Sequence, residues 1–513
     1  MKKSVPPGVL PVASIDPSSR TPLYRQLYEG YRDAIVERRL RAGQRLPSTR
    51  TIAAELRISR IPVLNAFEQL ISEGYFESRV GSGTFVARTL PEELSRAALR
   101  AADGNPMGRP GRRVIARIPA ALARPVDQPW FRGRGAFGVG QPPVDLFPFR
   151  VWARIAARHS RRTDPDLLYY GHAMGLPSLR ESLAEYLRSS RGVRCDAEQI
   201  MIVSGSQQAV DVTARVLLDE GSPVWLEEPG YFGAQKALKM ARARLVPVPV
   251  DDEGLDVEAG IERCRDARAA FVTPSHQCPL GMTMSAPRRL ALLDWARSEG
   301  AWIIEDDYDS EYRFGNLPIA ALQGLDRDSR VIYIGTFTKM LYPAIRLGYV
   351  VLPRDLLAPF VAVRKGMDMF SPTFHQAVLA DFIREGHFER HIRRTRSLCR
   401  ERRTTLVAGL ERELGSVVRV LGDAAGMYLT VALPDHVDDL AIGLRAGAIG
   451  IKAMPLSQFY LGRPRRRGLV LGYGGVSLPE VEEGIARLAP IVREHLDPQF
   501  QVPVQRVAHA SSD

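Results

Sequence analysis

The 513-residue sequence contains only four cysteines, Cys195, Cys264, Cys278 and Cys399, and none belongs to a CxxC pair or another metal-ligand spacing. This scarcity argues against a disulfide or zinc framework and favours the reduced thiols of a cytoplasmic protein. Apolar runs are also short, and none approaches the length needed to cross a bilayer. Prolines interrupt the apolar residues near the start, so we expect no signal peptide. Internal repeats are absent from the sequence.

Net charge is small outside the N-terminal quarter. The formal net charge is +12, and residues 1–135 hold 23 Lys and Arg against 12 Asp and Glu. Residues 136–513 hold 47 bases against 46 acids, which is close to neutral. A basic excess confined to one region indicates a polyanionic partner there, although a solvated basic tail is the alternative. The length predicts two or three domains.

Residues 20–88 carry the pattern of three short helices followed by a β-hairpin. One apolar helical face runs through residues 22–40, Ser48 and Ser59 are placed to cap a second and a third helix, and residues 75–86 form two strands around Gly-Ser-Gly. This order is that of a winged helix-turn-helix, a DNA-binding fold. The apolar residues of the third helix that we expect to face inward are Val63, Phe67, Leu70 and Ile71.

The predicted third helix begins with polar and basic residues. A recognition helix uses its N-terminal residues to reach base edges and phosphates, and arginines near the second helix and beside the wing can meet backbone phosphates. Three-helix units with arginines also occur in proteins that bind no DNA, so the pattern alone leaves that alternative open. The candidate DNA-binding residues are Arg50, Ser59, Arg60, Arg79, Gly81 and Gly83.

Residues 46–86 closely resemble the DNA-binding domain of GntR-superfamily regulators. The resemblance rests on "LPSTR", "SR", "EGY" and "GSGTFV". One departure is Pro62, where the family usually has Thr, and this removes a phosphate contact without disturbing the start of the helix. The expected partner of this domain is DNA, at promoter half-sites.

A segment rich in Arg, Ala, Pro and Gly follows at residues 89–135. It holds nine bases and four acids and lacks sustained periodicity. We interpret it as a basic interdomain linker with one short helix at 91–102. Its charge either attracts DNA non-specifically or keeps the linker extended and soluble.

Residues 136–497 predict an α/β domain. Short apolar runs that end in polar residues alternate with helical segments, which implies a mainly parallel, doubly wound sheet. The polar ends are "SGSQQ", "EEPGY", "EDDY" and "GTFTK". Ligands bind at the carboxyl ends of the strands in such sheets, so we expect these ends to form one site.

The polar ends supply the groups that a pyridoxal 5′-phosphate site needs. Lys339 follows a buried apolar run, and a partly desolvated lysine amine forms Schiff bases. A carboxylate of "EDDY" against a pyridine nitrogen would keep that nitrogen protonated. Ser206 at a helix N-terminus and Arg346 suit a phosphate, and Tyr231 suits the ring face. Each residue alone would usually be structural, but the whole set in this order rarely arises by chance.

This region resembles a fold-type I aminotransferase, and with the GntR-like part the whole chain resembles the MocR/GabR-type transcriptional regulators. The motifs are "SGSQQ", "EEPGY", "TPSHQCPLG", "EDDYDSEY", "GTFTKMLYPAIRLGY" and "LVLGYGG". The resemblance implies Lys339 as the Schiff-base residue, Asp306 at the ring nitrogen and Tyr308 at the ring hydroxyl. It implies a homodimer in which Tyr170 reaches the partner's phosphate. The other implied cofactor contacts are Ser206, Gln207, Tyr231, Thr336, Thr338 and Arg346.

Two positions depart from the aminotransferase pattern. Cys278 stands where the enzymes usually have an asparagine that contacts the ring hydroxyl, and Val470 stands where they carry the arginine that clamps a substrate carboxylate. We therefore expect an effector without a carboxylate in the usual place, or another arginine in that role. The arginines nearest in sequence are Arg463, Arg465, Arg466 and Arg467.

Three functions remain open at this point. The first is a DNA-binding regulator that senses a small amine, an amino-acid-like effector or pyridoxal phosphate itself, with little or no transaminase turnover. The second is a working aminotransferase with an accessory winged-helix domain, because the lysine, aspartate and tyrosine set serves both. The third is a structural dimer without a cofactor. The N-terminal charge and Val470 favour the first.

Overall fold

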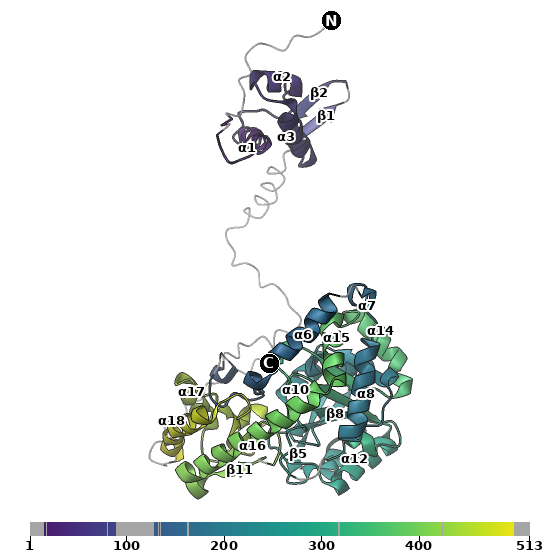
Figure 1. Cartoon of the computed structure of the whole chain (residues 1–513), viewed down its shortest axis with the longest axis vertical. Helices are drawn as coiled ribbons and strands as arrows, with labels where there is room; N and C mark the ends of the chain where they lie inside the picture. The colour runs from purple at the N-terminus through teal and green to yellow at the C-terminus, as the bar shows by residue number, and fades with distance from the viewer. Residues whose placement is uncertain are drawn as a thin grey trace, which may run out of the picture. The chain divides into compact units, whose positions relative to one another are not determined.

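The structure is a computed structural model that describes residues 15–496 except 17, 80, 89–127, 132, 134, 162–163, 316–318 and 423. The described residues form two compact units, 15–88 and 128–496 (Figure 1). The helix expected at 91–102 lies outside the described residues. None of the helices in the two units is long and apolar enough to cross a membrane.

The first unit packs three helices against a two-stranded hairpin. Its elements are α1 (Leu23–Val36), α2 (Thr49–Glu55), α3 (Arg60–Ser72), β1 (Phe76–Arg79) and β2 (Gly83–Val86). Ser48 caps α2, and its hydroxyl accepts from the backbone N–H of Thr51 at 3.1 Å. The rings of Tyr31, Phe67 and Phe76 meet edge to face, with centroids 4.9 to 5.8 Å apart. This aromatic cluster holds α1, α3 and the hairpin together.

The hairpin pairs antiparallel, from Phe76 with Val86 to Arg79 with Gly83. Gly81 and Gly83 have φ of 76° and 105°, in the region that favours glycine, so the Gly-Ser-Gly sequence permits the tight turn. The predicted winged helix-turn-helix is therefore the observed fold of this unit.

Two local expectations in this unit were wrong. The first helix ends at Val36 rather than at residue 40, because Arg38 takes a left-handed φ of 61° that breaks the helical path. Ile71 does not face inward but is 36% exposed. Leu70 fills the core position, and the next residue points about 100° further round the helix.

The second unit is built on an eight-stranded sheet with the order β3-β10-β9-β8-β7-β4-β5-β6. The strands in that order are β3 (Ile200–Val203), β10 (Gly348–Val351), β9 (Val331–Thr336), β8 (Trp302–Asp307), β7 (Ala269–Val272), β4 (Pro223–Glu228), β5 (Arg244–Asp251) and β6 (Gly254–Leu255). The strands β9, β8, β7, β4 and β5 pair in parallel, whereas β10 is antiparallel to both its neighbours. The sheet is mainly parallel, as the sequence predicts.

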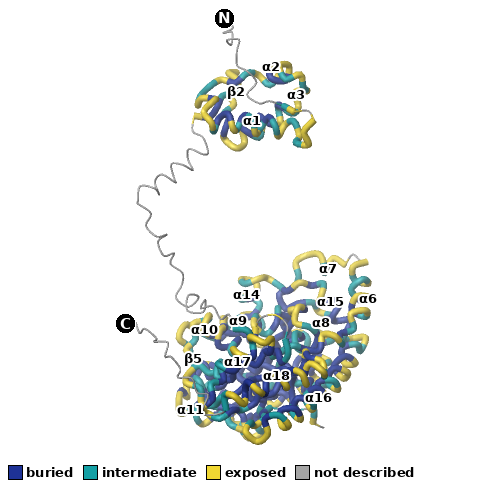
Figure 2. Tube along the Cα trace, turned by 90° about the vertical axis from the view of Figure 1, so that its left-hand side faces the viewer, coloured by how far each residue is buried: buried dark blue, intermediate teal, exposed yellow. Residues whose placement is uncertain are grey.

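Helices cover this sheet and a second, smaller one. The α-helices are α6 (Phe149–Ser160), α7 (Pro165–Leu168), α8 (Pro177–Arg191), α9 (Ser206–Leu217), α10 (Phe232–Met240), α11 (Val257–Cys264), α12 (Ala286–Glu299), α13 (Leu322–Leu325), α14 (Leu357–Met367), α15 (Thr373–Arg384), α16 (His387–Leu414), α17 (Asp439–Ala448) and α18 (Leu478–Leu496). Short 3-10 turns are η1 (Pro129–Phe131), η2 (Val144–Leu146), η3 (Ala197–Gln199), η4 (Pro343–Ile345), η5 (Arg354–Leu356), η6 (Gly415–Val417) and η7 (Leu456–Phe459). Figure 2 shows the buried interior that these layers enclose.

The smaller sheet is antiparallel and has the order β11-β12-β14-β13. Its strands are β11 (Arg419–Leu421), β12 (Tyr428–Leu433), β14 (Arg467–Gly472) and β13 (Met454–Pro455). Residues of this sheet share a core with α16, α17 and α18, including Leu406, Leu429, Ile442, Leu471 and Ile485. The sheet therefore forms the centre of a subdomain that brings its own side chains towards the larger sheet.

The packed part of the second unit starts before residue 136. Trp130 is only 5% exposed and belongs to a hydrophobic cluster with Leu280 and Val470. The Nζ of Lys452 donates to the backbone oxygen of Pro129 at 2.8 Å. Residues 128–131, which lie within the predicted linker, are thus anchored on the large unit.

Candidate functional site

A cavity of about 300 Å³ lies at the carboxyl ends of β8 and β9 in the large unit. The position agrees with the expectation that the polar ends of the strands form one site. Among the cofactor contacts expected from the sequence, the cavity is lined by Ser206, Gln207, Tyr231, Asp306, Tyr308, Thr336, Thr338, Lys339 and Arg346. Tyr170 is different, because it is 82% exposed and does not line this cavity.

Lys339 follows β9 and projects its amine into the cavity. Its Nζ donates to the backbone oxygen of Gly140 at 2.8 Å, and a side chain at Gly140 would collide with that nitrogen. Burial lowers the pKa of Lys339, against the opposing effect of Asp309, Cys278 and Asp306. A lysine whose neutral form is favoured by burial is suited to attack a carbonyl carbon.

Asp306 lies in β8, all of whose residues are buried. Burial, with the nearby carboxylates of Asp307 and Asp309, raises the pKa of Asp306 to about 7. Its Oδ1 is buried and has no hydrogen-bond partner among the described residues. A buried carboxyl oxygen without a donor is costly, so this atom fits an N–H group supplied by a bound molecule.

Another part of the cavity lining has the features of an anion site. Helix α9 begins at Ser206 and directs its free backbone N–H groups there, preceded by Gly205 with a φ of 99°. Arg346 has a left-handed φ of 50°, and its Nη1 would lie 3.4 Å from a Cβ placed on Gly205. The backbone N–H of Thr338 donates to Thr336 Oγ1 at 3.2 Å. A helix N-terminus and a guanidinium close together suit a phosphate.

Tyr231 and Gln207 complete the predicted set in different ways. Tyr231 is the residue before α10, and burial, with Asp306 nearby, raises its pKa. The side chain of Gln207 lines the cavity but donates from Nε2 to the backbone oxygen of Gly233 at 3.0 Å, so it also ties α9 to α10. The lysine, the unpaired carboxyl oxygen and the anion site together fit pyridoxal phosphate. When bound, that group supplies an electron sink for an attached amine.

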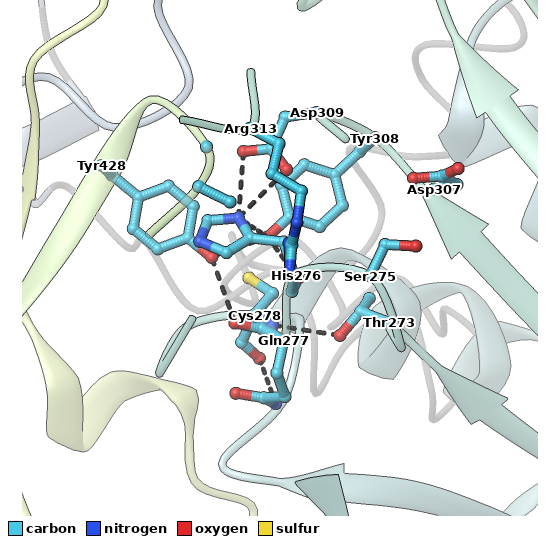
Figure 3. A network of polar contacts seen from close by, with 12 residues as sticks. Thr273, Ser275, His276, Gln277, Cys278, Asp307, Tyr308, Asp309, Arg313 and Tyr428 are labelled. Carbon is cyan, nitrogen blue, oxygen red and sulfur yellow. Dashed lines mark hydrogen bonds and ion pairs between the residues drawn. The ribbon is translucent and has the colours of Figure 1, made fainter. Parts of the chain in front are cut away.

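The polar network around Tyr308 was not predicted from the sequence (Figure 3). The Nδ1 of His276 lies 3.0 Å from Asp309 Oδ1, and Tyr308 donates from its hydroxyl to the backbone oxygen of His276 at 2.9 Å. The hydroxyl oxygens of Tyr308 and Tyr428 are 2.6 Å apart. Asp309 stands within "EDDYDSEY" and could have been singled out, whereas Tyr428 comes from β12 of the smaller sheet and has no local motif.

The remaining wall of the cavity is mostly apolar. Cys278 lines it, and burial raises the pKa of that thiol. The apolar lining residues from several elements are Phe131, Val139, Phe232, Met427, Met454 and Phe459. Phe131 lies in the segment interpreted as the linker, so it was not predicted from the sequence.

Basic residues are few in the lining. Lys339 and Arg346 are the basic side chains among the described residues that line the cavity. Val470 is fully buried in the hydrophobic cluster that contains Trp130, and Arg467 is engaged with Asp439 Oδ1 at 3.2 Å. The exposed residues Arg463 and Arg465 do not line the cavity.

In the first unit, all six candidate DNA-binding residues are exposed. Ser59 precedes α3 in an extended conformation, and its hydroxyl makes no capping bond. Arg60 donates from Nε to Thr49 Oγ1 at 3.1 Å, which places the starts of α2 and α3 side by side. Arg79 in the wing contacts Glu77 at 3.4 Å, and its guanidinium carbon lies 4.8 Å from the ring centroid of Phe85. These residues remain candidates for contacts with DNA.

Comparisons with known proteins follow the same division of the chain. The family described as "Aminotransferase class I and II" matches residues 136–488, and "Bacterial regulatory proteins, gntR family" matches residues 23–86. A "Probable rhizopine catabolism regulatory protein MocR" of Rhizobium meliloti is 42% identical over 92% of this chain and 94% of its own length. The "HTH-type transcriptional regulator TauR" of Rhodobacter capsulatus is 33% identical over 94% of this chain and 100% of its own.

Solved structures resemble the large unit. The α-aminoadipate aminotransferase LysN of Thermus thermophilus, complexed with N-(5′-phosphopyridoxyl)-L-leucine, is 30% identical with a TM-score of 0.66. The alignment covers 77% of this chain and 99% of that protein. The likeness therefore extends to the cavity-bearing fold, and the relatives named as regulators cover the N-terminal unit as well.

Proposed function

This chain belongs to the MocR-type transcriptional regulators, in which a GntR-family domain precedes an aminotransferase class I and II domain, and we propose that its large unit senses a small amine, an amino-acid-like molecule or pyridoxal phosphate itself. It is a DNA-binding regulator with pyridoxal phosphate as cofactor. The observation that carries the proposal is the cavity in which Lys339, Asp306 and Arg346 meet, on the same chain as a winged helix-turn-helix.

The residues of the cavity have separate proposed roles. Lys339 would hold the cofactor covalently, Asp306 would keep the ring nitrogen protonated, and Ser206 and Arg346 would hold the phosphate. Tyr308, supported by Tyr428, is placed to donate to the ring hydroxyl. When Lys339 is free, its amine donates to the backbone oxygen of Gly140, and an amine effector would favour this free state of the lysine.

The hydrogen bond from Lys339 to Gly140 connects the cavity with the N-terminal stretch of the large unit. Gly140 lies in the first described stretch after the linker, close in sequence to Phe131, which also lines the cavity. We infer that the occupancy of Lys339 changes how this stretch is held. Such a change can alter the arrangement of the DNA-binding units if the two states of Lys339 favour different arrangements.

Dimerisation is part of the proposal. Leu168, Tyr169 and Tyr170 are 70%, 76% and 82% exposed, which is unusual for three consecutive apolar or aromatic residues. A symmetric partner that covers this stretch would bring Tyr170 to the partner's phosphate, and two winged helices would meet two promoter half-sites. A cytoplasmic location follows from the role and is proposed with it.

The alternative, a working aminotransferase, is not favoured. MocR and TauR match more than nine-tenths of the chain, whereas the match to the aminotransferase LysN covers 77% of it. The described lining of the cavity also has no basic residue left for a substrate carboxylate once Lys339 and Arg346 hold the cofactor. We expect turnover to be absent or vestigial.

The experiment compares binding of the full-length, cofactor-loaded protein to DNA upstream of its own gene and to random DNA of equal length. We expect preference for the upstream DNA and binding that weakens steeply with salt, because basic residues release counterions from the phosphates. Equal binding to both DNAs at every salt concentration would contradict the regulator role.

A further inference from the structure

Ile61 is an isolated apolar side chain in an otherwise polar place. It is 66% exposed in the first turn of α3, directly after Arg60, while Val63, Ala66, Phe67 and Leu70 bury the other side of the helix. Single exposed apolar residues are common on protein surfaces, so exposure alone decides nothing. What distinguishes Ile61 is its position at the N-terminal end of the helix that a helix-turn-helix inserts into the major groove.

Asn65 lies one helical turn beyond Ile61 and is also exposed. Residues four apart share one helix face, so the two side chains stand next to each other. The amide of Asn65 makes no hydrogen bond to another residue of the described first unit. The face therefore presents a branched alkyl group and a free amide side by side.

The basic residues around Ile61 complement the negative charge of nucleic acid. Arg60 adjoins Ile61 and is held by Thr49 at the start of α2, where Arg50 follows. The wing adds Arg79, and the Arg45 side chain passes within 3.4 Å of a Cβ placed on Gly83. An apolar protein partner would make no favourable contact with these arginines. The phosphates on both sides of a DNA groove would pair with them.

Resting on the proposed function, we propose that α3 reads adjacent A·T base pairs, with Ile61 packed against the 5-methyl group of a thymine and Asn65 bonded to the major-groove edge of an adenine. The thymine methyl is the apolar group that distinguishes this base in the major groove. The N6 and N7 atoms of adenine present a donor and an acceptor that match one asparagine amide.

The test uses a DNA site that the full-length, cofactor-loaded protein selects from a random-sequence pool. Each thymine of the site is replaced in turn by deoxyuridine, which removes only the methyl group. We expect one position in each half-site to weaken wild-type binding about fourfold, the order of one buried methyl group. Ile61→Ser should bind more weakly overall and should no longer distinguish thymine from deoxyuridine at that position.

The matched control is Ile71→Ser, an equal change at the other end of the same helix, where Ile71 is 36% exposed. This variant should keep both the affinity and the response to deoxyuridine. A second set of DNA sites replaces each adenine in turn by 7-deazaadenine. At one adenine next to the sensitive thymine, this replacement should weaken the binding of the wild type but not that of Asn65→Ala.

The outcomes separate the inference from the proposed function. Failure to select any site would contradict DNA recognition itself. Selection of a site in which no deoxyuridine matters, or in which Ile61→Ser responds as the wild type does, would overturn the assignment of Ile61 and leave the regulator role intact. Equal sensitivity of wild type and Asn65→Ala to every 7-deazaadenine would overturn the assignment of Asn65.

Discussion

The hydroxyl oxygens of Tyr308 and Tyr428 lie 2.6 Å apart and join the loop after β8 to the smaller sheet. Burial raises the pKa of both phenols, so both remain protonated at neutral pH. Tyr308 also donates to the backbone oxygen of His276 at 2.9 Å and Tyr428 to that of Gln277 at 3.3 Å, so either phenol can be the donor in the contact that supports the Tyr308 hydroxyl. Tyr308 can redirect its proton to a bound molecule without losing that support.

We therefore expect Tyr428→Phe to weaken the binding of pyridoxal phosphate by roughly threefold to tenfold, the effect of one lost hydrogen bond. Tyr308→Phe should weaken it further, because it removes the donor itself. Cofactor titrations that follow protein fluorescence measure both constants. Tyr342→Phe, at a half-buried tyrosine outside the cavity, is the control. Unchanged cofactor affinity in both Tyr308→Phe and Tyr428→Phe would show that neither hydroxyl contributes to cofactor binding.

Lys339 should be the residue that carries the cofactor. Borohydride treatment of the loaded protein should fix the cofactor on the peptide that contains Lys339, as read by mass spectrometry, and Lys339→Ala should abolish the fixation. Lys452→Ala is the matched control, since this lysine also donates to a backbone oxygen at 2.8 Å and also has a pKa lowered by burial. Fixation on any other lysine would contradict the site assignment.

The carboxyl group of Asp306 makes the cofactor-free protein sensitive to pH. Burial raises its pKa from 3.8 to about 7, so the folded state keeps a proton that the unfolded chain releases near pH 4. The contribution of the Asp306 carboxyl group to the free energy of unfolding is therefore complete at low pH and is lost as the pH rises towards 7.

Asp306→Asn should therefore reduce the fall in melting temperature between pH 5 and pH 8, by an amount that corresponds to a few kcal/mol, because one pKa unit is about 1.4 kcal/mol. The fall should not vanish, because burial also raises the pKa of Glu227 and Glu305 to about 7. Glu401→Gln, at an exposed carboxylate in α16, should leave the profile unchanged. An identical profile for Asp306→Asn would show that this carboxyl group is ionised in the folded apoprotein.

The apolar wall of the cavity predicts an effector without a carboxylate. Val470 is buried, and the basic residues that line the described cavity are the two assigned to the cofactor. A carboxylate left unpaired there costs several kcal/mol, enough to remove millimolar affinity. Glutamate and alanine should leave the absorption spectrum of the loaded protein unchanged, whereas a simple amine should shift it. Rapid conversion of the cofactor by glutamate would refute this prediction and favour the aminotransferase.

Local motifs were sufficient to predict the two folds and to choose the lining residues contributed by β8, β9 and α9. Each of those side chains follows directly from a strand end or a helix start, so its position depends on a few neighbouring residues. Tyr428 and Phe131 could not be found this way, because long-range packing brings them to the cavity from the smaller sheet and from the assigned linker. Ile71 was misplaced for a related reason: the helical period permits it inside, and only the competition with Leu70 for the core excludes it.

The most direct test of the account is the affinity of the full-length, cofactor-loaded protein for its selected DNA site, measured by fluorescence anisotropy with and without an amine that shifts the cofactor spectrum. The amine should change the affinity of the wild type and leave that of Lys339→Ala unchanged, while both proteins bind the site. Equal affinity of the wild type with and without the amine, at concentrations that fully shift the spectrum, would contradict the claim that this cavity controls DNA binding.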